Sequence, residues 1–298
     1  MIAETQKALE SIGSKDKLKT TSFVDATIEF LDYYECATQS DGALPVYVGI
    51  DDVDRHTGGF HPSEFVVVAG RPGTGKSCLA LQLSQFEAQD NQNHVLYISS
   101  EMLPRELAQR SIIGATGVNS KKIRDRTLSD DDFTKIRRAA SELSETKIDF
   151  VGGRLFVDEI VALARYHKRV NETSLVVVDL LGHVKVRNRN GRSRTEQISE
   201  VTNTLKDLAM SLEVVVVGVV QLNREADGQT PLLKHLKDSG AYEEDANVVL
   251  FLHRPGKCSS EETKLIVAKH RAGSTATVDL TFDKQRHRFS AEALPGVF

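Results

Sequence analysis

The chain has 298 residues, of which 40% are hydrophobic and 27% charged, and its formal net charge is -4 at pH 7. These values are typical of a soluble globular protein, and no apolar run approaches the roughly 18 residues that a membrane-spanning helix needs. A weakly acidic protein meets nucleic acid only through local basic clusters. The N-terminus lacks the basic flank and apolar core of a secretion signal, which favours a cytoplasmic location.

The three cysteines, Cys36, Cys78 and Cys258, are odd in number and widely spaced. This pattern argues against a disulfide framework and against a cysteine-based metal site. We therefore interpret them as reduced thiols.

The N-terminal segment separates from the rest of the chain by its composition. Residues 1–20 are polar and predict an arm, whereas Phe23, Phe30 and Tyr34 belong to an apolar pattern with helical spacing that predicts one amphipathic helix over 23–38. The helix could cap its own domain or reach a neighbouring subunit, and the residues alone favour the first. We divide the chain into an N-terminal arm and helix, 1–44, and a main domain, 45–298.

The main domain shows alternating strand and helix patterns, followed by strands with short connections. The predicted strands cover 65–69, 95–99, 147–151, 175–179, 214–220, 248–252, 264–269, 277–282 and 286–289. This order predicts an α/β fold with a mainly parallel sheet, flanking helices and antiparallel strands at the C-terminal edge.

Helical signals lie between these strands. Pro104 is suited to the first turn of a helix that runs to about Ala115. Ser129 and Asp132 form a capping box for a helix with an apolar stripe that includes Phe133. Residues 195–212 predict a longer helix, and residues 223–245 are polar and turn-rich, which predicts a long loop.

A complete phosphate-binding loop of the form G-x-x-x-x-G-K-[ST] follows the first strand of the main domain and precedes a helix. In this motif the backbone N–H groups surround phosphates, the lysine reaches the outer phosphates and the hydroxyl completes a magnesium shell. The residues expected to bind the nucleotide are Gly70, Arg71, Pro72, Gly73, Thr74, Gly75, Lys76, Ser77 and Cys78.

Polar residues end three other apolar strands, where open α/β sheets place their ligands. We expect Asp179 to hold magnesium together with Ser77. Glu101 follows a strand that we expect to neighbour the phosphate-loop strand, and it either polarises the attacking water or is an N-terminal helix charge. Gln221 could sense the outer phosphate and relay its position to the following loop.

Two groups of cations have both functional and structural interpretations. Lys269 and Arg271 could be delivered to a phosphate of a neighbouring copy, or could simply protect an edge strand from aggregation. The segment 185–194 contains five cations and no acid, so it could contact a nucleic-acid backbone or form a solvated loop. Its candidate DNA contacts are Arg187, Arg189, Arg192 and Arg194.

The order of these motifs resembles the motor domain of DnaB-type replicative helicases. The resemblance covers roughly residues 45–290 and is far more specific than the phosphate loop alone. It rests on Gly58-Gly59-Phe60, the loop 70–77, Ser99-Ser100-Glu101-Met102, Val176-Val177-Val178-Asp179, Val220-Gln221-Leu222-Asn223-Arg224, Leu236-Lys237-Asp238-Ser239-Gly240 and Ala268-Lys269-His270-Arg271-Ala272-Gly273.

The resemblance implies a RecA-like ATPase core that assembles into a homo-hexameric ring, uses ATP and magnesium, and moves 5′ to 3′ along single-stranded DNA. Glu101 would be the catalytic glutamate and Gln221 the coupling glutamine, with Lys76 at the phosphates. Arg271 would be an arginine finger supplied in trans with Lys269 beside it. The DNA would contact the segment 185–194 together with Lys237, Asp238 and Gly240, and the helix 23–38 would dock on the next subunit.

The chain also departs from the family pattern. About 40 residues precede the main domain, which is too few for the usual helical N-terminal domain that receives primase, so the resemblance suggests a shortened phage or mobile-element form. A helicase loader or other replisome proteins remain candidate partners. Alternative functions are a non-translocating ATP-binding regulator of a host helicase ring and another DNA-dependent ATPase of the RecA superfamily.

Overall fold

The computed structural model describes residues 20–38, 45–187, 191–236, 240–255 and 262–291. The chain divides between residues 44 and 45 into two compact units. In the first unit, α2 (Phe23–Thr38) confirms the predicted helix. Phe23, Ile28, Phe30 and Leu31 are all exposed on it, so the described residues leave these apolar side chains uncovered.

The second unit is built on one nine-stranded sheet with the order β3-β2-β4-β5-β1-β6-β7-β8-β9. Pairing is parallel from β3 to β6 and antiparallel from β6 to β9, which confirms the predicted fold class. The strands are β1 (Phe65–Gly70), β2 (Val95–Ser99), β3 (Ile148–Gly152), β4 (Leu175–Asp179), β5 (Val215–Gln221), β6 (Val248–His253), β7 (Glu262–His270), β8 (Ala276–Asp283) and β9 (Arg288–Ser290).

One prediction about the sheet is wrong. The strand that precedes Glu101, β2, pairs with β3 and β4, whereas β1 pairs with β5 and β6. The apolar runs of β4 and β5 are equally suited to any central position, because parallel strands buried on both faces carry near-continuous hydrophobic side chains. The sequence pattern therefore indicates strands without indicating their neighbours.

Two hydrophobic clusters cover the two faces of the sheet. Along β1, Val66 and Val68 belong to the first cluster and Phe65 and Val67 to the second, because successive side chains of a strand point to opposite faces. Helices α3 (Asp51–Thr57) and α4 (Lys76–Gln89) contribute to the first cluster, and α8 (Val157–Asn171), α9 (Arg194–Leu212) and α10 (Gly240–Asp245) to the second.

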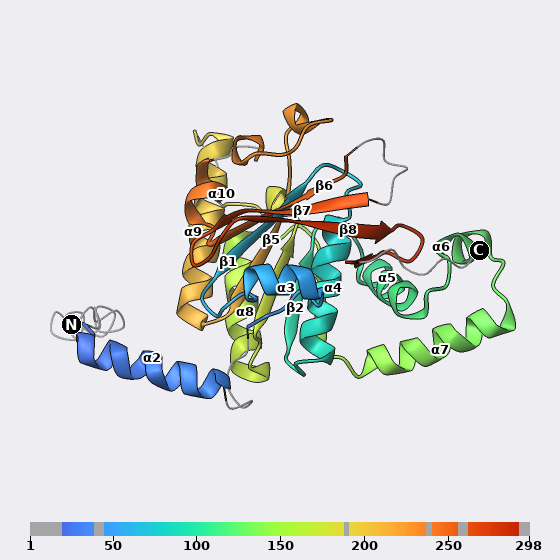
Figure 1. The fold of residues 1–298 in the computed structure, drawn as a ribbon, viewed down its shortest axis with the longest axis horizontal. Coiled ribbons are helices and arrows are strands. Elements are labelled where there is room, and N and C mark those ends of the chain that lie inside the picture. The colour runs from blue at the N-terminus through green and yellow to red at the C-terminus, as the bar shows by residue number, and fades with distance from the viewer. Residues whose placement is uncertain (1–19, 39–44, 188–190, 237–239, 256–261, 292–298) are drawn as a thin grey trace, which may run out of the picture. The chain divides into compact units, whose positions relative to one another are not determined.

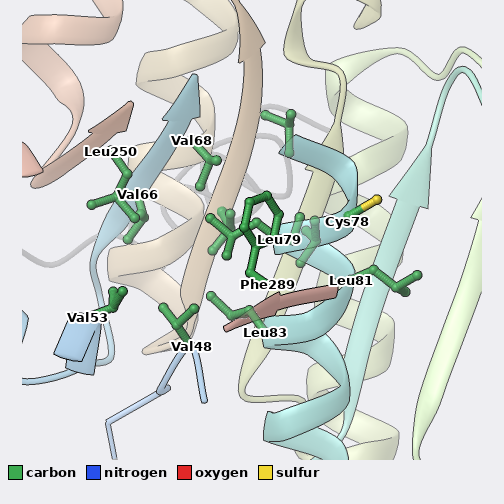
Figure 2. Packing of buried hydrophobic residues seen from close by; sticks show 14 of the residues in the cluster. Val48, Val53, Val66, Val68, Cys78, Leu79, Leu81, Leu83, Leu250 and Phe289 are labelled. Carbon is green, nitrogen blue, oxygen red and sulfur yellow. The ribbon is translucent and has the colours of Figure 1, made fainter. Parts of the chain in front are cut away.

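The first cluster supports the helix that begins at the phosphate loop. Figure 2 shows Phe289 of β9 beside Leu79 and Leu83 of α4, with Val66 and Val68 of β1 in the same cluster. The Phe289 ring also stacks on Phe282, with 4.3 Å between the centroids. The antiparallel edge strands thus fold back against α4.

A group of three helices, α5 (Pro104–Thr116), α6 (Ser120–Asp125) and α7 (Asp130–Ser144), lies together at one end of this unit (Figure 1). The predicted capping box of Ser129 and Asp132 is present. Phe133, expected in a buried stripe, is 48% exposed. Among the described elements, α7 packs chiefly on α5 and not on the sheet, so its apolar stripe is only partly covered.

The segment 223–245, in its described residues 223–236 and 240–245, is more ordered than the loop that its composition predicts. It contains the short helical turns η2 (Arg224–Ala226) and η3 (Leu233–His235), and then α10. His235, Leu236 and Tyr242 are buried and anchor it to the domain. Among the described residues, no helix combines the length and apolar character needed to cross a membrane.

Candidate active site

The loop between β1 and α4 has the conformation that a phosphate site requires. Gly73 and Gly75 have φ values of 78° and 98°, in the left-handed region that favours glycine. At Gly75 an added Cβ would also lie 2.6 Å from Phe289 Cζ. The Thr74 hydroxyl and the Lys76 ammonium both donate to the Arg71 carbonyl, at 2.9 and 3.1 Å, so the loop is closed by its own polar groups.

A cavity of about 590 Å³ lies over this loop, a size suited to a nucleotide. Six of the nine predicted nucleotide-binding residues line it: Pro72, Gly73, Gly75, Lys76, Ser77 and Cys78. Glu101 and Gln221 line it as well. The structure therefore brings the phosphate loop and two of the strand-end residues to a single cavity.

The Arg71 side chain takes a different direction. Its guanidinium forms a bidentate pair with Asp227, with Nε–Oδ1 at 2.9 Å and Nη2–Oδ2 at 3.2 Å. It also donates to the carbonyls of Leu222 and Asn223, at 3.0 and 3.3 Å. Arg71 thus ties the phosphate loop to the chain that follows Gln221, and does not line the cavity.

The register of the sheet explains how the acids meet the loop. Ser99 is opposite Asp179, and Gly70 is opposite Gln221, so the carboxyl ends of these strands lie on the same side of the domain. Tyr97 donates to Asp179 Oδ2 at 3.0 Å. Burial raises the pKa of Asp179, an effect that the nearby Ser77 hydroxyl, the Tyr97 hydrogen bond and the Lys76 charge oppose.

Asp179 has the properties of a magnesium partner. Its Oδ1 atom is buried and accepts no hydrogen bond from the described residues, while Ser77 lies beside the same carboxylate. Within the described ranges, no group of three or more His, Cys, Asp or Glu side chains could hold a metal by itself. A magnesium ion here would be held by Ser77, Asp179 and phosphate oxygens, which suits an ion that binds through few carboxylates.

Glu101 extends into the cavity from the turn after β2, and its side chain is half exposed. Two groups define its surroundings: His183 Nε2 lies 3.8 Å from Glu101 Oε1, and the Lys76 charge interacts electrostatically with it. A carboxylate with access to both solvent and the phosphate loop could accept a proton from an attacking water.

Lys269 and Arg271 lie near the amino ends of the parallel strands, whereas the phosphate loop lies at their carboxyl ends. Lys269 Nζ donates to the Glu243 carbonyl and Arg271 Nη2 to the Glu244 carbonyl, so both side chains point to α10. Because β7 runs antiparallel to β6, its end lies near the start of β1. The six residues of β1 span roughly 20 Å, which keeps Arg271 away from its own cavity.

The basic segment is only partly described. Arg187 pairs with Asp158 at 2.7 Å and lies over the Phe156 ring. Arg192 pairs with Glu200, and Arg194 donates to the Gly182 carbonyl. Of the remaining predicted DNA contacts, Arg189, Lys237 and Asp238 lie outside the described residues, and Gly240 is the first residue of α10.

Several residues of the site were not found from the sequence. Arg110, Lys284 and His287 line the cavity from α5 and from the β8–β9 connection, which lie far from the loop in the sequence. Arg110 Nη1 is 3.8 Å from Cys78 Sγ. Only Tyr97 offered a signal, because a tyrosine in a buried strand needs a partner for its hydroxyl.

Lys76 carries a testable electrostatic property. Burial lowers its pKa from 10.5 to about 8, although the charges of Asp179 and Glu101 act in the opposite direction. The unfolded chain keeps this proton up to about 10.5, so the free energy of unfolding rises with pH between these values. Bound phosphates favour the charged ammonium, so we expect triphosphate affinity to fall above pH 8, by at most roughly tenfold per pH unit.

Equilibrium titration with a fluorescent ATP analogue from about pH 7 to 9.5 measures this fall. Calorimetry near pH 8.5 in two buffers of different ionisation enthalpy should show proton uptake on binding. The Lys76→Ala variant serves as the control, because it should bind weakly and without this pH dependence. A wild-type affinity that stays constant up to about pH 9.5 would contradict the lowered pKa of Lys76, whereas a Lys76→Ala variant that binds as tightly as wild type would contradict its assignment to the phosphates.

The comparisons with known proteins decide the family. Residues 46–291 match the family described as DnaB-like helicase C terminal domain. The chain belongs to this family. A replicative DNA helicase of Treponema pallidum is 34% identical over 252 residues, 84% of this chain and 57% of that protein. The replicative helicase of Geobacillus stearothermophilus is 29% identical over 95% of this chain and 65% of its own length.

The solved structures agree with the DnaB-like assignment. A structure described as an ATPase domain aligns with a TM-score of 0.82 and 31% identity, covering 91% of this chain and 99% of that domain. A DnaB-like replicative helicase studied with primase aligns with a TM-score of 0.79 and 31% identity, over 97% of this chain and 71% of that protein. This likeness confirms the RecA-like fold of a DnaB-like ATPase domain. The chain spans less than two thirds of the length of the curated Geobacillus and Treponema relatives.

Proposed function

We propose that the chain is the ATP-driven motor of a replicative DNA helicase, which forms a six-membered ring and moves 5′ to 3′ along single-stranded DNA. The observation that carries this proposal is the division of the site between the two ends of the parallel strands. Lys76, Glu101 and Asp179 lie at the carboxyl ends of these strands and Arg271 lies at their amino ends, a strand length away. A cation placed so far from its own cavity suits hydrolysis between subunits, where one copy supplies Arg271 to the next.

In this function each side chain has a separate role. Lys76 binds the outer phosphates, and Glu101 accepts the proton of the attacking water. Ser77 and Asp179 hold magnesium, which neutralises phosphate charge when bound. Arg271 of the neighbouring copy, with Lys269 beside it, stabilises the charge that develops on the transferred phosphoryl group.

Hydrogen bonds connect the phosphate loop to the chain that leads from Gln221 to residues 237–240, the second candidate DNA contact. This connection supports a coupling role for Gln221. Arg71 holds the carbonyls of Leu222 and Asn223, and the Leu222 amide donates to the Gly70 carbonyl at 3.2 Å. The Asn223 amide in turn donates to the His235 carbonyl at 3.0 Å. A displacement at Gln221 on phosphate release would therefore move the chain that leads to Lys237, Asp238 and Gly240.

The assembly would use the remaining predicted surfaces. The exposed apolar residues of α2 are suited to docking on a neighbouring subunit, since a helix of this kind needs a partner for its apolar face. The segment 185–194 and residues 237–240 would contact DNA phosphates in the channel. A helicase loader or another replisome protein would be needed to place a closed ring on DNA.

The proposal predicts that single-stranded DNA increases ATP turnover and that ATP promotes ring assembly. Phosphate release measured with and without an oligonucleotide, beside the molar mass in ATP, tests both. A triple change, Arg187→Ala, Arg189→Ala and Lys237→Ala, should reduce the slope of DNA affinity against salt by about one unit for each phosphate that is no longer neutralised. The matched control removes three cations from α6 and α7: Lys121→Ala, Arg124→Ala and Arg138→Ala.

The alternatives give different results in the same assays. A regulator of a host ring would bind ATP without DNA-stimulated turnover, and another RecA-superfamily ATPase would hydrolyse ATP on DNA without unwinding a duplex. An absence of stimulation by DNA, together with unchanged turnover in Glu101→Gln, would eliminate the motor function.

A further inference from the structure

The turn after β4 places a histidine against the turn after β2. The 3-10 helix η1 (Leu181–His183) follows Asp179 and returns the chain to Ser100. Ser100 Oγ accepts from the Leu180 amide at 3.0 Å, and lies 3.2 Å from the Asp179 carbonyl and 3.1 Å from His183 Nδ1. These contacts fix the imidazole ring relative to the strand ends.

The other nitrogen of the same ring faces the predicted catalytic carboxylate. His183 Nε2 lies 3.8 Å from Glu101 Oε1, which is an ion-pair separation and longer than a hydrogen bond. Catalytic contacts of this kind often shorten when substrate is bound. Among the described residues, the His183 ring is the one basic group found within ion-pair distance of the Glu101 carboxylate.

The hydrogen bonds of the Ser100 hydroxyl restrict which nitrogen of the His183 ring carries the proton. If the Ser100 hydroxyl donates to Nδ1, a neutral imidazole carries its proton on Nε2. If the hydroxyl donates instead to the Asp179 carbonyl, a neutral ring carries its proton on Nδ1 and turns the Nε2 lone pair toward Glu101. Repulsion between that lone pair and the carboxylate disfavours this tautomer.

The histidine reaches Glu101 from outside the nucleotide cavity. Glu101 lines the cavity over the phosphate loop, whereas His183 lines an adjoining cavity of about 690 Å³ together with Arg194 and Gln221. Lys76 and Asp179 are the charged groups that interact with Glu101 from the loop and from β4. A partner behind the carboxylate can orient it without contacting the nucleotide.

We infer that His183 is a positioning residue for Glu101, with Ser100 holding the ring so that Nε2–H keeps the carboxylate directed at the attacking water. The inference rests on the proposed function, in which Glu101 is the base. It predicts a change in turnover without a change in nucleotide affinity.

The test uses the full chain in the DNA-stimulated ATPase assay. For His183→Ala we expect kcat to fall about tenfold, with KM for ATP and the affinity for an ATP analogue unchanged, because the contact that Nε2–H is expected to make with the Glu101 carboxylate when substrate is bound is lost. His183→Gln should restore most of kcat, since its amide nitrogen can donate from a similar position. His167→Ala, which removes a histidine 3.3 Å from Asp149 and outside the nucleotide cavity, should have no effect.

The same changes in a Glu101→Gln background distinguish the two hypotheses. If His183 acts through Glu101, His183→Ala should cause no further loss there. Unchanged kcat in His183→Ala, alongside a large loss in Glu101→Gln, would overturn the inference and leave the proposed function intact. No loss in Glu101→Gln would reject the proposed role of Glu101 itself. A His183→Gln variant with the thermal midpoint of wild type and the kcat of His183→Ala would also overturn the inference.

Discussion

Replacing Glu101 by Gln should lower DNA-stimulated ATP hydrolysis by roughly 10²- to 10⁴-fold, the range typical of a lost general base. The carboxylate lines the same cavity as Lys76 and Ser77 and is positioned by the turn after β2. Glutamine keeps the size of the side chain but cannot accept the proton. Phosphate release under saturating ATP measures the loss, and a fluorescent analogue should bind as tightly as it does to wild type.

The matched control for this change is Glu142→Gln. Glu142 is an exposed glutamate on α7 that pairs with Arg138 at 2.8 Å, away from the phosphate loop. Its replacement should leave turnover within about twofold of wild type, since an isolated surface pair contributes little to stability. If Glu101→Gln hydrolyses ATP at the wild-type rate, Glu101 is an N-terminal helix charge and another group must act as base.

Replacing Arg271 by Ala should lower turnover by roughly 10³- to 10⁵-fold, as expected for an arginine finger, and should leave nucleotide affinity nearly unchanged. The physical reason is the position of Arg271 near the amino ends of the parallel strands, where its side chain contacts the Glu244 carbonyl and not the phosphate loop. Steady-state turnover and analogue binding are measured on the same preparation, with Arg138→Ala as the control for loss of an exposed cation.

A mixing experiment tests the predicted contribution of Arg271 to another copy. An Arg271→Ala chain keeps its own Lys76, and a Lys76→Ala chain keeps its own Arg271. Each is expected to be inactive alone, whereas mixed rings should recover part of the activity at interfaces where an intact Lys76 meets an intact Arg271. Equal loss of nucleotide affinity and turnover in Arg271→Ala would place this residue in its own subunit's site.

The site could be predicted well where its residues follow short local patterns. The phosphate loop has a fixed spacing, and Glu101, Asp179 and Gln221 each stand at or just after the end of an apolar run that forms a buried strand. The capping box at Ser129 is equally local, and it is present. In these cases the physical cause lies within a few residues of the feature, so the sequence pattern contains it.

Other parts of the site could not be predicted because they depend on residues distant in the sequence. Arg110 and His287 reach the cavity only because α5 and the β8–β9 connection fold over α4. The Arg71 side chain could equally have faced the phosphates, and its pairing with Asp227 depends on the path of the chain after β5. Residues 223–245 have the polar composition of a loop, but His235 and Tyr242 are buried and order the helical turn η3 and the helix α10 that contain them.

The sequence by itself determined which chemical groups the protein carries and the order in which strands deliver them, because hydrophobic runs, glycines and terminal polar residues act locally. Only the tertiary structure decided which strands are neighbours. Because β4 and β5 lie between β2 and β1, Glu101 is separated from the strand that precedes the phosphate loop. The common register nevertheless places Glu101 and the loop at the same carboxyl end of the parallel strands. The antiparallel direction of β7 places Arg271 near the amino ends of the parallel strands, because strand direction is set by pairing and not by composition.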